Sequence, residues 1–291
     1  MDISKTGNIL VPHDFSEVAD NALSFANQFA KIFDKRVSLL HVVEKQGMFS
    51  GSVSSTDKTY KEAENKLQTI ATANSEKSSV ETETVLRPGN IFDEIGETAD
   101  GSKCTMIIMG THGIKGMQAL TGSRAMKVIT NSKTPFVVVQ KKGWNPDGMK
   151  KIVVPIDDEP ETKQKMHGAM FMAKIFNATL YILSQENSDE FVNNKIKNNV
   201  AWCRNNAKHE GIATEHITLS SKEDRTKGTI SKSVEIGADL IVVDTDPETN
   251  ITNYVLGPFE QKVIANDAQI PVMCINTKQV YSMAGNVFSY I

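Results

Sequence analysis

Short runs of Val, Ile and Leu alternate along the chain with longer stretches in which apolar residues recur every three or four positions. In the first half the apolar runs fall at 9–12, 37–43, 106–109 and 135–139. After the first run, apolar residues follow helical spacing from Val18 to Ile32, and Ser16 offers an N-cap oxygen in front of them. Continuous apolar strands between amphipathic helices are typical of a parallel sheet covered on both faces. The pattern therefore predicts an α/β fold with doubly wound, Rossmann-like parallel sheets.

This succession of elements occurs twice. Pro155 repeats Pro12 at a distance of 143 positions, within similar apolar runs. Pro271 repeats Pro135 at a distance of 136 positions, so insertions and deletions separate the two copies. The turn-rich segment 141–148 lies between them and is typical of a linker. We therefore expect two tandem domains of the same class.

Composition narrows the class of protein further. Of the 291 residues, 40% are hydrophobic and 23% are charged, as in ordinary globular proteins. The net charge of -3 gives no general attraction to nucleic acid, and no apolar run approaches the ~20 residues of a membrane span. The N-terminus has no signal-peptide pattern, and Cys104, Cys203 and Cys274 form no C-x-x-C pair. We expect a cytoplasmic protein with packed, reduced thiols, no metal site, and neither nucleic acid nor membrane as a partner.

The segment 109–123 is the strongest candidate for chemistry. It reads M-G-T-H-G-I-K-G-M-Q-A-L-T-G-S and lies between an apolar run and an amphipathic stretch. Gly110 and Gly113 allow the main chain to approach a ribose or a phosphate without interference from a Cβ atom. The residues that open the next helix favour an anion through their free N–H groups, and they are Gly122, Ser123 and Arg124.

Two other segments end at the same edge of the predicted sheet. Ligands of doubly wound sheets bind at the carboxyl ends of the strands, where the strand order reverses. Asp14 follows the first strand behind Pro12, whose fixed φ shapes the turn. Val42 and Val43 end the second strand and offer backbone groups to a base. Asp14 has two open interpretations, because it either contacts a ligand or caps the turn before the following helix.

The second copy lacks most of these features. Asp244, Pro247 and Pro258 replace the first two glycines and the serine of the first copy. The carboxylate places a repulsive charge near the expected phosphates, and each proline removes an amide donor. Asp157 is retained at the position of Asp14, but alone it makes no site. We expect no nucleotide in the second half.

The segments Pro12-His-Asp14 and Leu39-Leu-His-Val-Val-Glu44, together with the Gly-x-x-Gly…Gly-Ser loop, resemble the universal stress protein family over nearly the whole chain. The resemblance implies that 1–143 is a universal stress protein domain with a candidate ATP site. It also implies that 149–278 is a degenerate copy, followed by a C-terminal tail, 279–291. The strands at 135–139 and 271–275 would then pair edge to edge in an intramolecular pseudo-dimer; a further homodimer is left open.

The resemblance also implies the ligand and its contacts. The family binds ATP, with or without Mg²⁺, through an aspartate near adenine or ribose and through a strand backbone at adenine. Carried over to this chain, the site comprises Pro12, Asp14, Val42, Met109, Gly110, Gly113, Gly122, Ser123 and Arg124. Nucleotide-binding members have nine residues between the second glycine and the Gly-Ser pair, whereas 114–121 supplies one fewer. That difference would displace amide donors by ~3 Å.

Other residues near the predicted site are expected to play no catalytic part. We interpret His13, His112 and Lys115 as solvated loop residues and His41 as a strand-end histidine whose hydrogen bonds are satisfied. No P-loop, G-x-S-x-G elbow or G-x-G-x-x-G turn occurs, which argues against a P-loop NTPase, an α/β-hydrolase and a dinucleotide-binding protein. No residue is an obvious general base for a nucleophilic water, so any ATP hydrolysis would be slow. Three functions remain open: a stress-response regulator that binds an adenine nucleotide and is recognised by an unknown protein partner, a nucleotide-free interaction scaffold, and a slow ATPase.

Overall fold

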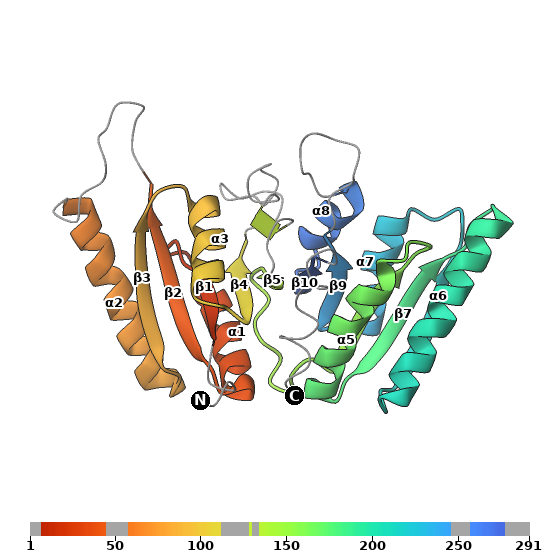
Figure 1. Cartoon of the computed structure of the whole chain (residues 1–291), viewed down its shortest axis with the longest axis horizontal. Coiled ribbons are helices and arrows are strands. Elements are labelled where there is room, and N and C mark those ends of the chain that lie inside the picture. The colour runs from red at the N-terminus through yellow and green to blue at the C-terminus, as the bar shows by residue number, and fades with distance from the viewer. Residues whose placement is uncertain (1–6, 45–57, 112–127, 130–133, 246–256, 277–291) are drawn as a thin grey trace. The chain divides into compact units, whose positions relative to one another are not determined.

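The computed structural model of the chain describes residues 7–44, 58–111, 128–129, 134–245 and 257–276. These residues divide into two compact units, of which the first ends at Gly143 and the second begins at Trp144. Both units alternate strands and helices along the chain (Figure 1). The helices that the structure describes are each too short or too polar for a membrane span.

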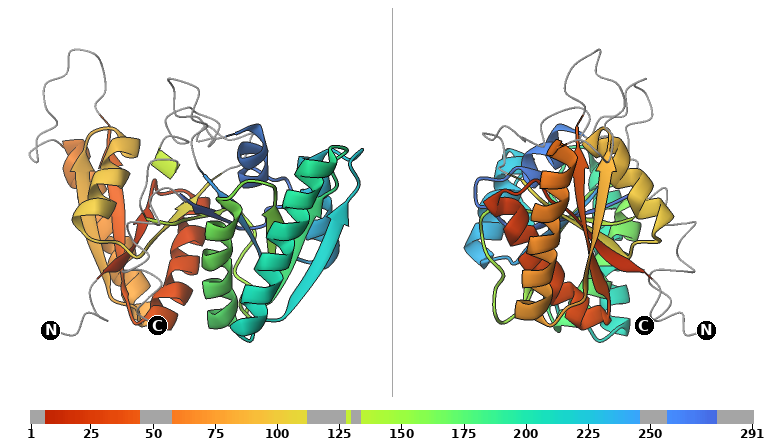
Figure 2. Two further views of the ribbon diagram at one scale, coloured as in Figure 1. Left: turned by 45° about the vertical axis from the view of Figure 1, so that its right-hand side comes forward. Right: turned by 90° about the vertical axis from the view of Figure 1, so that its left-hand side faces the viewer.

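The first unit contains a parallel sheet with the strand order β3-β2-β1-β4-β5. Its strands are β1 (Asn8–Pro12), β2 (Arg36–Val43), β3 (Thr82–Pro88), β4 (Met106–Gly110) and β5 (Phe136–Val139). Its helices are α1 (Glu17–Phe33), α2 (Lys58–Ser78) and α3 (Ile91–Gly101). Figure 2 shows α1 and α2 on one face of the sheet and α3 on the other. The change of face follows from the reversal of strand order after β3, because parallel crossovers are right-handed.

The second unit repeats this topology with the strand order β8-β7-β6-β9-β10. Its strands are β6 (Lys151–Ile156), β7 (Thr179–Gln185), β8 (Thr214–Leu219), β9 (Leu240–Asp244) and β10 (Val272–Ile275). Its helices are α5 (Thr162–Phe176), α6 (Glu190–His209), α7 (Arg225–Ile236) and α8 (Pro258–Ile264). Helices α5 and α6 pack against each other, as do α7 and α8.

The fold predicted from the apolar pattern is confirmed. Strand β1 is buried along its whole length, as a central strand covered on both faces must be. Helix α1 follows Ser16, whose side chain accepts a hydrogen bond from the Ala19 N–H, and ends at Asp34 in the left-handed conformation. The expected pairing of 135–139 with 271–275 stays a prediction, and the tail 279–291 lies outside the described residues.

Candidate functional site

The strand order of the first unit reverses between β1 and β4, which are neighbours in the sheet. The carboxyl ends of β1, β2 and β4 therefore meet at one edge, the usual ligand-binding position of such sheets. Five predicted site residues lie at this edge, namely Pro12, Asp14, Val42, Met109 and Gly110. The other four, Gly113, Gly122, Ser123 and Arg124, lie outside the described residues, as do His112 and Lys115.

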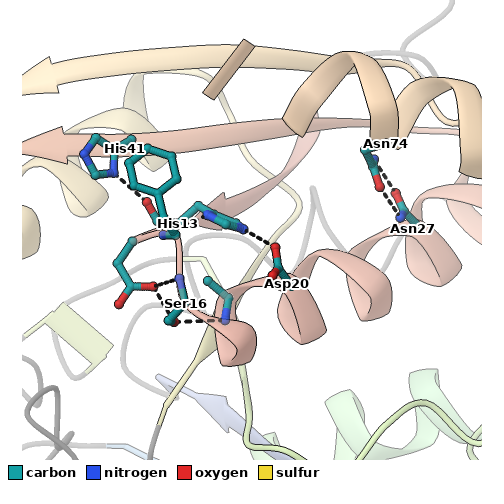
Figure 3. Close-up of polar contacts among 9 residues, drawn as sticks. His13, Ser16, Asp20, Asn27, His41 and Asn74 are labelled. Carbon is teal, nitrogen blue, oxygen red and sulfur yellow. Dashed lines mark hydrogen bonds and ion pairs between the residues drawn. The ribbon is translucent and has the colours of Figure 1, made fainter. Parts of the chain in front are cut away.

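The turn after β1 is closed by its own side chains (Figure 3). Asp14 accepts hydrogen bonds at Oδ1 from the Ser16 N–H at 3.1 Å and from the Ser16 hydroxyl at 2.5 Å. Ser16 in turn caps α1. Of the two roles that the sequence leaves open for Asp14, its carboxylate thus performs turn capping. Its contact with a ligand stays a prediction.

His13 is buried, which corrects the expectation that it is a solvated loop residue. Its ring folds back into the turn, where Nδ1 accepts the Phe15 N–H at 3.1 Å. Nε2 therefore carries the proton and donates to Asp20 Oδ1 at 3.2 Å. Burial lowers the pKa of His13, although Asp20 opposes that effect. His13 is thus a neutral structural group at pH 7.

The rings of His41 and Phe15 lie against each other at the end of β2, with an angle of 33° between their planes. His41 donates from Nδ1 to the His13 carbonyl oxygen at 2.7 Å, which confirms the interpretation of a satisfied strand-end histidine. The Phe15 and His41 ring centroids are 4.2 Å apart, and Lys66 Nζ lies 4.4 Å from the Phe15 centroid. Phe15 has a φ of 67°, a left-handed conformation that costs a non-glycine residue about 1–3 kcal/mol. Neither the strain at Phe15 nor the position of Lys66 is evident from periodicity, because both depend on contacts between elements.

Gly110 allows α1 to pass close to the end of β4. A Cβ atom at this position would lie 2.2 Å from the Val18 carbonyl oxygen and 2.5 Å from the Val18 carbonyl carbon. Both atoms belong to the backbone of α1, so no side-chain rotation relieves the overlap. The fold therefore requires glycine at this position whether or not a ligand binds.

The corresponding edge of the second unit is filled by a group of charged side chains. Lys165 of α5 is 1% exposed and lies with Nζ 2.8 Å from Asp244 Oδ1 and 3.9 Å from Asp157 Oδ2. Arg225 of α7 lies 2.8 Å from Asp157 Oδ2 and stacks on the Phe259 ring at 4.4 Å. We call Asp157, Lys165, Arg225 and Asp244 the charge cluster.

The charge cluster corrects the expectation that Asp244 leaves a repulsive charge at this edge. Lys165 neutralises Asp244 and also faces Asp157. Burial alone would raise the pKa of Asp157, but Lys165 and Arg225 outweigh it and lower that pKa. Burial alone would lower the pKa of Lys165, but Asp244 and Asp157 raise it. Asp157 and Lys165 are therefore both charged at pH 7, and the charge cluster pairs two acidic with two basic side chains.

The cysteines are buried, as expected of packed thiols. Burial raises the pKa of Cys104 and of Cys203 to about 12, and it also raises the pKa of Cys274. A thiol with such a pKa is almost wholly protonated at pH 7 and is a poor nucleophile. Among the described residues, no group of three or more His, Cys, Asp or Glu side chains is placed to hold a metal ion.

The topology defines an α/β protein with two doubly wound units, in each of which the strand order reverses between two central strands. The model of the universal stress protein family matches residues 5–140. Two universal stress proteins of Methanocaldococcus jannaschii are 31% identical over 153 residues and 32% identical over 138 residues. Each alignment spans 46% of this chain, and they cover 94% and 81% of the respective relatives. The chain belongs to the universal stress protein family.

The tandem fold also has a counterpart among solved structures. A universal stress protein from Archaeoglobus fulgidus matches with a TM-score of 0.73 at 19% sequence identity. The match covers 95% of this chain and 100% of that protein. At this level of identity the likeness concerns the fold alone, and it extends across both units.

Proposed function

We propose that this member of the stress-response family binds ATP or a related adenine nucleotide, with or without Mg²⁺, at the carboxyl edge of its first unit. Nucleotide occupancy would then bias a conformation that a protein partner recognises. The observation that supports the proposal most is the backbone geometry at the end of β2, beside the turn that carries Asp14 and the glycine that ends β4.

Val42 presents backbone groups at a place where its neighbouring strand has already ended. The last paired residue of β1 is Pro12, opposite Leu40. The Leu40 carbonyl oxygen accepts the His13 N–H at 2.7 Å, so it points toward the β1 side. Alternate residues of a strand direct their N–H and C=O groups to the same side, so Val42 does so as well, beyond the end of β1. These are the donor and acceptor that the edge of an adenine ring requires.

The second unit is proposed to bind no nucleotide. Its edge has Asp244 in place of Gly110, and α8 begins with Pro258, which has no N–H to offer a phosphate. A single nucleotide per chain follows from this difference. The proposed domains remain 1–143, with the site, and 149–278, without one, joined in a pseudo-dimer.

Ligand identification tests the proposal directly. Protein purified without added nucleotide is denatured, and the released small molecules are identified by chromatography and mass spectrometry. Calorimetry with Mg-ATP should then give a stoichiometry close to one per chain. Gly113→Asp should abolish binding, whereas Gly101→Asp, at the end of α3 where a Cβ has open space, should not. No co-purified nucleotide together with no heat at millimolar Mg-ATP would refute the proposal.

The alternative is a nucleotide-free interaction scaffold, and two observations favour it. Asp14 and Gly110 each have a structural role without any ligand, in turn capping and in the packing of α1. The same calorimetry decides between the two functions. If binding is seen, phosphate release measured on the wild type and on Gly113→Asp shows whether the protein is also a slow ATPase.

A further inference from the structure

The most unusual buried group of the second unit is the ammonium of Lys165. It comes from the core-facing side of α5, among neighbours such as Met166 and Ala169 that are also buried. A lysine at such a depth is stable as a cation only if anions compensate for its lost hydration. Asp244, at the end of β9, and Asp157, directly after β6, supply that compensation.

Comparison of the two units shows how this pair arises. Helices α1 and α5 end at equivalent left-handed caps, Asp34 and Asn177, so Lys165 takes the position of Ala22. Asp244 ends β9 as Gly110 ends β4. An alanine and a glycine of the first unit are thus replaced in the second by a cation and an anion that contact each other at 2.8 Å. Asp244 without Lys165 would lose its contacting cation, and Lys165 without Asp244 would keep only the more distant Asp157, at 3.9 Å.

The other two residues of the charge cluster, together with residues of α8, surround this pair. Arg225 reaches Asp157 from the first turn of α7, and its guanidinium covers the ring of Phe259 on α8. Glu260 lies nearby, and burial together with Asp244 raises its pKa. Side chains from α5, α7 and α8 therefore meet at the carboxyl ends of β6 and β9. This edge corresponds to the edge of the first unit at which the ligand is proposed to bind.

We infer that Lys165 is a built-in ligand of the second unit. Its alkylammonium group occupies the edge from within and neutralises Asp244. The second unit therefore folds and stays closed without any external molecule. The occupant is a primary ammonium held by two carboxylates, so the site that remains when the side chain is removed should accept a small alkylammonium ion. This inference concerns the second unit alone and does not depend on nucleotide binding by the first.

Chemical rescue tests the inference on the full chain. Lys165→Ala removes three methylene groups and the ammonium, which n-propylammonium matches. Both tryptophans, Trp144 and Trp202, belong to the second unit, so tryptophan fluorescence follows the unfolding of that unit. The variant should unfold at a lower urea midpoint than the wild type. Millimolar n-propylammonium chloride should restore most of the loss, whereas equal concentrations of 1-propanol or sodium chloride should not.

A matched control separates the site from a general effect of the amine. Lys174 lies on the same helix and pairs with Glu210 at the surface, with its side chain 53% exposed. Lys174→Ala should shift the midpoint little and respond equally to the three additives. A folded Lys165→Ala that is as stable as the wild type, or that 1-propanol rescues equally, would overturn the inference. No nucleotide is present, so this result leaves the proposal for the first unit unaffected.

A second comparison covers the case in which Lys165→Ala does not fold. Lys165→Met retains the bulk of the side chain and leaves Asp244 without its cation. Adding Asp244→Asn removes the uncompensated anion and leaves Asp157 paired with Arg225. The double variant should be more stable than Lys165→Met alone, or should fold where the single variant does not. A double variant no better than the single one, or two variants that both fail to fold, would overturn the inference.

Discussion

Gly110 provides the sharpest prediction about the first unit. In Gly110→Ala the new methyl group would lie 2.2 Å from the Val18 carbonyl oxygen, far inside van der Waals contact. The first turn of α1 must move away from the end of β4, and the buried residues behind it must repack. Overpacking of this kind costs typically 1–3 kcal/mol, and we expect the upper part of that range because the clash involves backbone atoms.

Urea unfolding is followed by circular dichroism, which detects the helices of both units, and by tryptophan fluorescence, which identifies the transition of the second unit. The remaining transition measures the loss in the first unit. With a loss of about 3 kcal/mol and an m-value of about 1–3 kcal/mol/M, the transition of the first unit should move down by roughly 1–3 M. Tryptophan fluorescence of the same samples should not change.

Gly96→Ala is the matched control, because a Cβ atom there meets nothing within 4 Å. Gly96 lies inside α3, where alanine is favoured over glycine by about 0.5–1 kcal/mol, so this variant should be more stable than the wild type. The same substitution should thus have opposite signs at two positions of one unit. If Gly110→Ala proved as stable as Gly96→Ala in the absence of ligand, the close passage of α1 would be refuted, and Gly110 would be needed only for ligand approach.

Three further predictions follow from the described contacts. The pKa of His13 is lowered chiefly by burial, so below pH 6.5 the unfolded chain binds a proton that the folded chain resists. The urea midpoint of the first unit, followed by circular dichroism, should therefore fall as the pH drops from the ordinary histidine pKa of 6.5 to about 5. A flat profile would contradict the buried neutral ring. In the second unit, the pKa of Asp157 is lowered and that of Lys165 is raised, so their pairing stabilises the fold fully between the ordinary values of 3.8 and 10.5. The difference in fluorescence midpoint between the wild type and Lys165→Met should shrink as the pH falls below 3.8 or rises above 10.5; a difference independent of pH would show that volume rather than charge sets it. Ser16→Ala removes both the cap of α1 and a donor to Asp14 and should cost about 1 kcal/mol. Ser24→Ala, at an exposed position of the same helix, should stay within about 0.5 kcal/mol of the wild type, and equal losses in the two variants would argue against the cap.

The α/β fold and its duplication are predicted by the sequence because both depend on local order. Apolar runs of strand length and helical spacing recur within a few residues, and Ser16 precedes its helix directly. Parallel strands with helical crossovers then leave few topologies, so the edge that carries Asp14, Val42 and Gly110 follows from strand order. The described residues of the predicted site lie at this edge, and their contact with a ligand stays a prediction.

The exposure of His13 and the environment of Asp244 were predicted wrongly, for a common reason. Loop position indicates a solvated histidine, but the ring of His13 folds back onto the Phe15 N–H and Asp20. The charge of Asp244 is compensated by Lys165, 79 positions away in the sequence. A signal was present in the second copy, since a lysine stands at a core-facing position where the first copy has Ala22.

Periodicity and motif spacing thus determine the class of fold, the repeat and the position of the edge at which the first unit is proposed to bind a ligand. Only the tertiary structure decides which polar groups near the two edges are buried and which partners they have. The physical reason is that burial and ion pairing depend on distances between elements, and the chain brings Lys165 and Asp244 together only when α5 packs on the sheet.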